Sequence, residues 1–264
     1  MTRAADSSLA GERAALIVGH PGHELRVLGW MRGCQPAVAV LTDGSGHGQN
    51  GRIELTTDLL DAAGCRRSSL YGIHTDKDIY QAILEGEDDF FLRLAGQLAD
   101  WLLLEEVDVV ASDAVEGYNP THDLCAAVAG RAARLATARS SRAIAHFTFL
   151  LTGAPVMREA PENAVAVELS AAALADKLSE SRRYAARAGG ALVQEVETMI
   201  AEFGEASFAR EFLQPATLAK DFAVFAQQRP FYETHGEKQV AAGLYRHVIR
   251  YQAHVAPIIR ALAS

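Results

Sequence analysis

Cysteine is scarce in this chain of 264 residues, and acidic residues outnumber basic ones. The only cysteines are Cys34, Cys65 and Cys125. They form no Cys-x-x-Cys pair and cannot all pair within the chain, which excludes a disulfide scaffold and a cysteine-rich zinc module. Lysine and arginine together number 25 against 33 aspartates and glutamates, a formal net charge of −8. We therefore expect no nucleic-acid partner, since duplex binding needs a basic surface.

Long apolar runs are also missing. No run approaches the roughly 20 residues that span a bilayer, and the polar N-terminus lacks the apolar core of a signal peptide. We therefore expect a cytoplasmic protein with no membrane partner and a flexible segment over residues 1–12. The phosphate-loop motif GxxxxGK[ST] and the serine-hydrolase motif GxSxG are absent as well, which argues against both kinds of site.

The composition itself, with 49% hydrophobic and 22% charged residues, is typical of a globular protein. Short apolar runs predict buried strands over 14–18, 37–41, 107–111 and 143–151, with helices between them. This alternation predicts an α/β fold in which helices flank a mostly parallel sheet. We expect a single domain over residues 1–264.

The remaining sequence is predominantly helical in pattern. Residues 170–264 are expected to form a mainly helical extension packed on the sheet, with Ser170 as a helix cap. A short third strand is expected over 69–71. The predicted helices cover 79–104 (with a break near Glu85-Gly86), 171–203, 207–227 and 237–262.

Three of the nine histidines follow predicted strands. His20 and His23 come directly after the strand 14–18, and His122 follows the strand 107–111. Residues three apart share a face if the segment starts a helix, and α/β proteins bind ligands at the carboxyl ends of their strands. Three imidazoles with an open fourth position describe a catalytic zinc site. The pattern thus predicts a site for Zn²⁺ or another divalent metal.

The motifs around these histidines resemble those of the LmbE/PIG-L family of metal-dependent N-deacetylases. Residues 19–24 read GHPGHE, where the family has Ala-His-Pro-Asp-Asp-Glu. Residues 119–122 read NPTH, where the family has His-Pro-Asp-His, and residues 41–44 resemble the loop after the family's second strand. The resemblance implies a Rossmann-like fold and the removal of an N-acetyl group from a substrate containing N-acetylglucosamine.

Carried over position by position, the resemblance retains His20 and His122 as metal ligands. His23 stands where the family has an aspartate ligand, so the site would hold one negative charge less and leave the ion more electrophilic. Asn119 stands where the family has a histidine that stabilises the oxyanion, and an amide can still donate a hydrogen bond there. Gly22 stands where the family has its general base.

The missing base leaves three alternatives open, because general acid–base help is typically worth about 10²–10⁴-fold in rate. In the first, a carboxylate at a neighbouring strand end takes over the role, and Asp113 and Glu24 are the candidates we favour. In the second, the metal activates water without a side-chain base. In the third, hydrolysis is lost and the protein binds metal or sugar, or performs other metal-assisted chemistry.

The expected function is therefore a zinc-dependent amidohydrolase that removes an acyl group from an N-acylated amino sugar or a related small amide. Its partner would be a small-molecule or glycan-type substrate, and a homo-oligomer remains open. We expect Asp43, Glu116 and Arg26 to contact the substrate, because each lies beside one of the three motifs.

Overall fold

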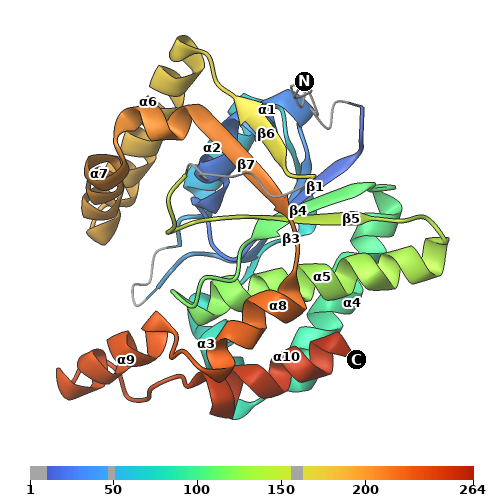
Figure 1. The fold of residues 1–264 in the computed structure, drawn as a ribbon, viewed down its shortest axis with the longest axis vertical. Coiled ribbons are helices and arrows are strands. Elements are labelled where there is room, and N and C mark those ends of the chain that lie inside the picture. The colour runs from blue at the N-terminus through green and yellow to red at the C-terminus, as the bar shows by residue number, and fades with distance from the viewer. Residues whose placement is uncertain (1–10, 47–50, 156–162) are drawn as a thin grey trace.

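The computed structural model describes residues 11–46, 51–155 and 163–264. Its centre is a seven-stranded sheet with the order β3-β2-β1-β4-β5-β7-β6 (Figure 1). The prediction for residues 1–12 lies almost entirely outside the described residues. The strands are β1 (Ala14–Val18), β2 (Ala37–Thr42), β3 (Arg66–His74), β4 (Val109–Asp113), β5 (Ala145–Phe149), β6 (Val165–Glu168) and β7 (Arg210–Pro215).

The first five strands are parallel, which confirms the predicted α/β class with a mostly parallel sheet. β7 runs antiparallel to β5, and β6 runs antiparallel to β7. Every residue of β1, β2 and β4 is buried, as expected for strands covered on both faces. These strands read as continuous apolar runs in the sequence for that reason.

Helices cover both faces of the sheet (Figure 1). Alternate residues of β1 point to opposite faces, so Ala15 and Ile17 join one core cluster while Leu16 and Val18 join the other. The Leu16 side packs against α1 (Leu28–Cys34), α2 (Ile53–Ala63) and α6 (Ala171–Ala188). The Ile17 side packs against α3 (Asp76–Glu85), α4 (Asp88–Leu104), α5 (Pro120–Ser140) and α10 (Ala256–Ala263).

Smaller elements complete the fold. The 3-10 helix η1 (His23–Val27) joins β1 to α1, and α7 (Ala191–Phe203) packs on α6. None of the helices in the described ranges has the length and apolar character of a membrane-spanning segment. The other elements are η2 (Glu205–Ala209), α8 (Leu218–Ala223), η3 (Val224–Ala226), α9 (Phe231–Ala241) and the π-helical turn η4 (Tyr251–Val255).

Several predicted boundaries are wrong in the C-terminal third. The helix expected over 171–203 is two helices, because Gly189 and Gly190 adopt positive φ angles between α6 and α7. The helix expected over 207–227 contains the strand β7, whose backbone pairs with β5 and β6. The stretch expected to be helical over 237–262 is interrupted between α9 and η4. Tertiary pairing overrides local helical pattern here.

The break near Glu85-Gly86 is confirmed. Gly86 ends α3 in the left-handed conformation with φ 67°, where glycine has no steric cost. The strand expected over 69–71 is longer and covers Arg66–His74. Its first residues escape prediction because β3 is an edge strand and these residues are polar and exposed. Polar edge strands lack the apolar alternation that identifies a strand in a sequence.

Candidate functional site

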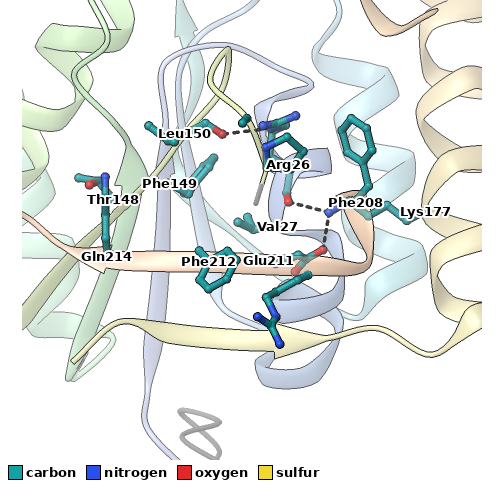
Figure 2. Close-up of a pocket in the computed structure, with 13 residues that line it drawn as sticks. Arg26, Val27, Thr148, Phe149, Leu150, Lys177, Phe208, Glu211, Phe212 and Gln214 are labelled. Carbon is teal, nitrogen blue, oxygen red and sulfur yellow. Dashed lines mark hydrogen bonds and ion pairs between the residues drawn. The ribbon is translucent and has the colours of Figure 1, made fainter. Parts of the chain in front are cut away.

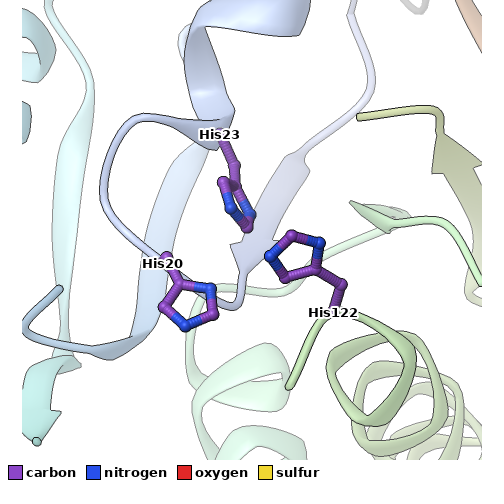
Figure 3. A group of neighbouring side chains, drawn as sticks. All are labelled: His20, His23 and His122. Carbon is purple, nitrogen blue, oxygen red and sulfur yellow. The ribbon is translucent and has the colours of Figure 1, made fainter. Parts of the chain in front are cut away.

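Three histidines converge at the carboxyl ends of the neighbouring strands β1 and β4. His20 follows β1, His23 begins η1, and His122 lies in the first turn of α5. One nitrogen atom from each ring lies within 4.8 Å of the others, and the ring centroids are 4.4 to 5.2 Å apart. Figure 3 shows the three rings gathered around one point. The site is the topological switch point of the sheet, since β2 continues the order on one side of β1 and β4 on the other.

The three imidazoles are neutral and shielded from water. His20 and His122 are only 6% and 7% exposed. Burial, reinforced by His23, lowers the pKa of both rings well below the usual range. Burial and then Arg52 lower the pKa of His23 to about 3. Neutral imidazole is the form that binds metal.

The donor set fits a divalent cation. Nδ1 of His122 is buried and has no hydrogen-bond partner among the described residues, a state that is rare for a buried polar atom. Three neutral imidazoles, one of them with an unused nitrogen, match the three protein ligands of a catalytic zinc site. The sequence predicted these same residues as ligands.

Asp113 lies behind His23, at the end of β4. It is fully buried, and its Oδ2 accepts hydrogen bonds of 2.8 Å from Nδ1 of His23 and from the Gly19 amide. The first bond directs the proton of His23 to Nδ1 and leaves Nε2 for the histidine cluster. Burial raises the pKa of Asp113 to about 7. The geometry thus connects Asp113 to the orientation of a ligand, while its predicted role as a base stays a prediction.

A carboxylate that the sequence motifs did not predict lies beside His20. Asp76, at the start of α3, is 3% exposed. Its Oδ2 accepts a 2.5 Å hydrogen bond from the Gly46 amide. Its Oδ1 lies 3.3 Å from Nε2 of His20 and makes no hydrogen bond within the described ranges. One oxygen of Asp76 is therefore held by the fold, and the other is unpaired at the cluster.

Tyr80 lies one helical turn after Asp76, on the same face of α3. Its hydroxyl accepts a 2.9 Å hydrogen bond from Nδ2 of Asn119. A signal for this face exists in the sequence: Thr75 and Asp78 form a capping box that starts α3 directly after β3. It was missed because the predicted strand ended several residues too early.

Asn119 is the N-cap of α5. Its Oδ1 accepts a 2.8 Å hydrogen bond from the Thr121 amide, while its Nδ2 donates to Tyr80. These two contacts fix the plane of the amide at the start of the helix that carries His122. The predicted contact with an oxyanion stays a prediction, and the second Nδ2 proton is the atom that would make it.

Gly22 occupies a strained and crowded position. Its φ angle is +105°, and a Cβ there would lie 3.1 Å from the ring of Tyr184 on α6. Tyr184 is 4% exposed, and its hydroxyl lies 3.1 Å from Oγ1 of Thr56. A tyrosine from another helix therefore crowds the position at which the sequence resemblance would place a base.

Glu24 belongs to the same buried network as Tyr184. It is fully buried, its Oε1 accepts a 2.7 Å hydrogen bond from Thr56, and its Oε2 accepts a 2.9 Å bond from the Gly22 amide. Burial raises the pKa of Glu24 to about 7. One oxygen of Glu24 is bonded to a backbone amide and the other to a side-chain hydroxyl. To act as a base, Glu24 would have to give up one of these hydrogen bonds.

Arg26 and Glu116 both hold the loop over residues 150–153, after β5. Arg26 donates to the carbonyls of Leu150 and Gly153, each at 3.1 Å. Glu116 accepts from the amides of residues 151–153 at 2.7 to 3.2 Å. Their predicted contacts with substrate stay predictions, because these polar groups already serve the loop.

Asp43 lies after β2, half-buried. Its Oδ1 accepts a 2.9 Å hydrogen bond from the Ser45 amide, and its carbonyl accepts from the Arg52 amide at 2.7 Å. The negative charge of Asp43 is close enough to act on His20. The predicted substrate contact of Asp43 is compatible with this place and stays a prediction.

A second group of buried charges lies away from the histidines, under β7 (Figure 2). Nζ of Lys177 lies 2.7 Å from Oε1 of Glu211 and 2.7 Å from the Arg26 carbonyl. Glu211 also accepts from the amides of Gly29 and Trp30. The cavity beside them measures about 30 Å³, room for about one water molecule. The group therefore anchors η1 and α1 to β7.

Solved structures share this architecture. The conserved protein TT1542 from Thermus thermophilus aligns with a TM-score of 0.51 and 17% identity, over 77% of this chain and 93% of that chain. A deacetylase triple mutant from the teicoplanin biosynthetic pathway has a TM-score of 0.48 and 15% identity, over 77% and 97% of the two chains. The A40926 pseudoaglycone deacetylase Dbv21 has a TM-score of 0.47 and 14% identity, over 77% and 96%.

At the level of sequence, no family model and no curated protein matches the chain. At 17% identity, the likeness to TT1542 concerns the fold alone. That likeness and the observed sheet agree on a Rossmann-like α/β architecture.

Proposed function

We propose that this protein is a metal-dependent amide hydrolase of the LmbE/PIG-L type, which removes an acyl group from an N-acylated amino sugar or a related small amide. The observation that carries the proposal is the cluster of three neutral histidines, one of them oriented by Asp113. The order of the motifs along the chain supports it. The parallel strands support it as well, because they bring these motifs to one edge of the sheet.

His20, His23 and His122 would hold the metal. A divalent cation bound there supplies a Lewis acid that polarises the acyl carbonyl and makes a water molecule more acidic. Asp113 keeps the proton of His23 on Nδ1, so that Nε2 stays available at every stage of the reaction. Asn119 would donate its second Nδ2 proton to the oxyanion that forms at the carbonyl.

The proton of the attacking water also needs an acceptor. Gly22 cannot provide one, and Glu24 and Asp113 are committed to other partners. We assign the step to Asp76, since its Oδ1 lies 3.3 Å from Nε2 of His20 and accepts no hydrogen bond from any residue that the structure describes. Its Oδ2 is anchored by the Gly46 amide, which would keep the carboxylate in one orientation while Oδ1 accepts the proton and then donates it to the amine nitrogen that leaves as the C–N bond breaks.

The test combines metal analysis with an assay for acyl release. The purified protein is expected to bind a divalent metal and to release acetate from N-acetylglucosamine or from a small N-acetyl amide only when the metal is present. His122→Ala is expected to lose both properties. If His122→Ala keeps the metal and no acyl compound is hydrolysed by the wild type, the proposal is wrong.

One observation favours a second candidate function, a protein that binds metal or sugar without hydrolysis. A Cβ at Gly22 would lie 3.1 Å from the ring of Tyr184 and would require a φ angle of +105°, so a base at this position is disfavoured. This candidate predicts bound metal, saturable sugar binding and no turnover. It also predicts that Asp76→Asn leaves the sugar binding unchanged.

A further inference from the structure

A row of aromatic side chains leads from the metal site to the surface of α9. The rings of Tyr118 and His122 are stacked, with centroids 6.3 Å apart. Tyr118 and Phe231 are stacked at 5.1 Å with their planes only 3° apart. The row continues with His235, whose ring centroid lies 5.6 Å from that of Phe231. Residues more than 100 positions apart thus form one continuous strip that starts at a candidate metal ligand.

The two central rings are exposed. Tyr118 is 41% exposed and Phe231 is 50% exposed. Single apolar side chains at a surface are ordinary, but adjacent ones beside a functional site are typical of ligand contacts. The strip therefore needs an explanation that its packing within the fold does not give.

The backbone holds the strip in place. The Tyr232 amide donates a 3.2 Å hydrogen bond to the Gly117 carbonyl, which ties the start of α9 to the loop that carries Tyr118. Gly117 has a φ angle of +66°, and a Cβ there would lie 2.7 Å from the Phe225 ring and 3.0 Å from Cβ of Pro230. Only glycine allows this close approach, so the position of Phe231 against Tyr118 is built into the fold.

Each of the two central rings has two neighbouring rings. Tyr118 contacts a ring on each side, His122 and Phe231, and Phe231 also contacts His235. A planar aromatic ligand would need an open ring face to stack on. A flexible aliphatic chain, in contrast, can lie along the edges and remove both rings from water.

We propose that Tyr118 and Phe231 bind an aliphatic acyl chain longer than acetyl, attached to the amide that lies at the histidine cluster. This inference rests on the proposed function and narrows its substrate class to N-acyl compounds with a medium or long chain. An acetyl group ends beside the metal site and cannot reach Phe231, which lies one ring beyond Tyr118. Only a longer chain gains from this surface.

The test measures binding, which needs no turnover. Zinc-loaded protein is titrated by calorimetry with acetohydroxamate and with octanohydroxamate, which carry the same metal-binding group. We expect octanohydroxamate to bind at least about tenfold more tightly. Tyr118→Ala and Phe231→Ala should each reduce this ratio about threefold or more, while Phe231→Leu should keep most of it. Leu104→Ala is the control, since Leu104 is 80% exposed and precedes β4, at the opposite end of the strands.

The other outcomes are distinguishable. Equal binding of the two hydroxamates, or a ratio unchanged in both alanine variants, overturns the acyl-chain proposal alone. So does a change of oligomeric state in these variants without a change of the ratio, which would make the strip a contact between copies. Failure of both hydroxamates to bind contradicts this proposal and the metal site together. Hydrolysis of N-acetylglucosamine, assayed separately, tests the proposed function by itself.

Discussion

Nδ1 of His23 donates a 2.8 Å hydrogen bond to Oδ2 of the fully buried Asp113. The same oxygen accepts a 2.8 Å hydrogen bond from the Gly19 amide. The backbone after β1 therefore fixes the carboxylate, and the carboxylate in turn fixes the side chain of His23. This arrangement makes a buried carboxylate the orienting partner of a candidate metal ligand.

Asp113→Asn tests this role. The amide side chain can present either a donor or an acceptor to His23, so the ring loses its preference for a proton on Nδ1. We expect zinc affinity to fall by about 10–100-fold, measured by competition with a chromophoric chelator. Asp100→Asn is the control, because Asp100 is an exposed residue of α4 that pairs with Arg139, and its zinc affinity should stay at the wild-type value. Unchanged affinity in Asp113→Asn would contradict the orienting role.

Asp76→Asn tests the assignment of the proton acceptor. Without an ionisable oxygen beside His20, kcat for acyl release should fall by at least about 100-fold, while the bound metal and KM stay close to wild type. Asp78→Asn, two residues along the same helix, should leave kcat within a few-fold. Loss of the metal in Asp76→Asn would instead show that Asp76 supports the metal site, and normal turnover would refute its role altogether.

Gly22→Ala tests the backbone strain and the crowding at this position. Forcing a φ angle of +105° on an L-residue costs about 1–2 kcal/mol, and the new Cβ also meets the ring of Tyr184. We expect the free energy of unfolding, measured in urea, to fall by at least this amount. Gly96→Ala, in α4 with open space around the new Cβ, should stabilise the protein by about 0.5–1 kcal/mol. Equal stability in Gly22→Ala and wild type would contradict the strain.

The candidate site could be predicted in part. The sequence predicts that His20, His23 and His122 lie together, because His20 and His23 come directly after one predicted strand. His122 follows another predicted strand after a loop, and parallel strands end at a common edge. Asp76 and Tyr80 were missed because β3 begins with exposed polar residues, so that its end and the start of α3 were misplaced. The crowding at Gly22 could not be predicted from the sequence, since it comes from Tyr184, more than 160 residues away in the chain.

In the fold as well, some strands follow from the local sequence and others depend on contacts with distant residues. The buried strands β1, β2 and β4 can be predicted from short apolar runs in the sequence. In contrast, β7 reads as part of a helix, and its extended form depends on hydrogen bonds to β5 and β6. Local patterns carry no information about such partners. The bonds of Arg26 and Glu116 to the loop 150–153 are of this second kind.

His146 gives the stability a defined pH dependence. Its Nε2 lies 2.8 Å from Oγ of Ser112, and burial, followed by Arg134, lowers the pKa of His146 to about 4. The unfolded chain therefore takes up a proton near pH 6.5 while the folded protein does not, so the stabilising contribution is complete above pH 6.5 and is lost as the pH falls toward 4. The free energy of unfolding in urea, plotted against pH, should have different slopes for wild type and His146→Asn only between these two pH values. In this range the wild type should lose more stability on acidification. Parallel curves throughout this window would contradict the shift.

The metal content of the purified protein tests the central claim most directly. Chelator-treated protein is incubated with zinc, desalted and analysed by mass spectrometry for metal, together with His20→Ala, His122→Ala and the control His146→Ala, whose histidine lies outside the cluster. The account predicts about one zinc per chain in wild type and in His146→Ala, and little or none in the two cluster variants. Full zinc occupancy in His20→Ala and His122→Ala, or none in wild type, would contradict it.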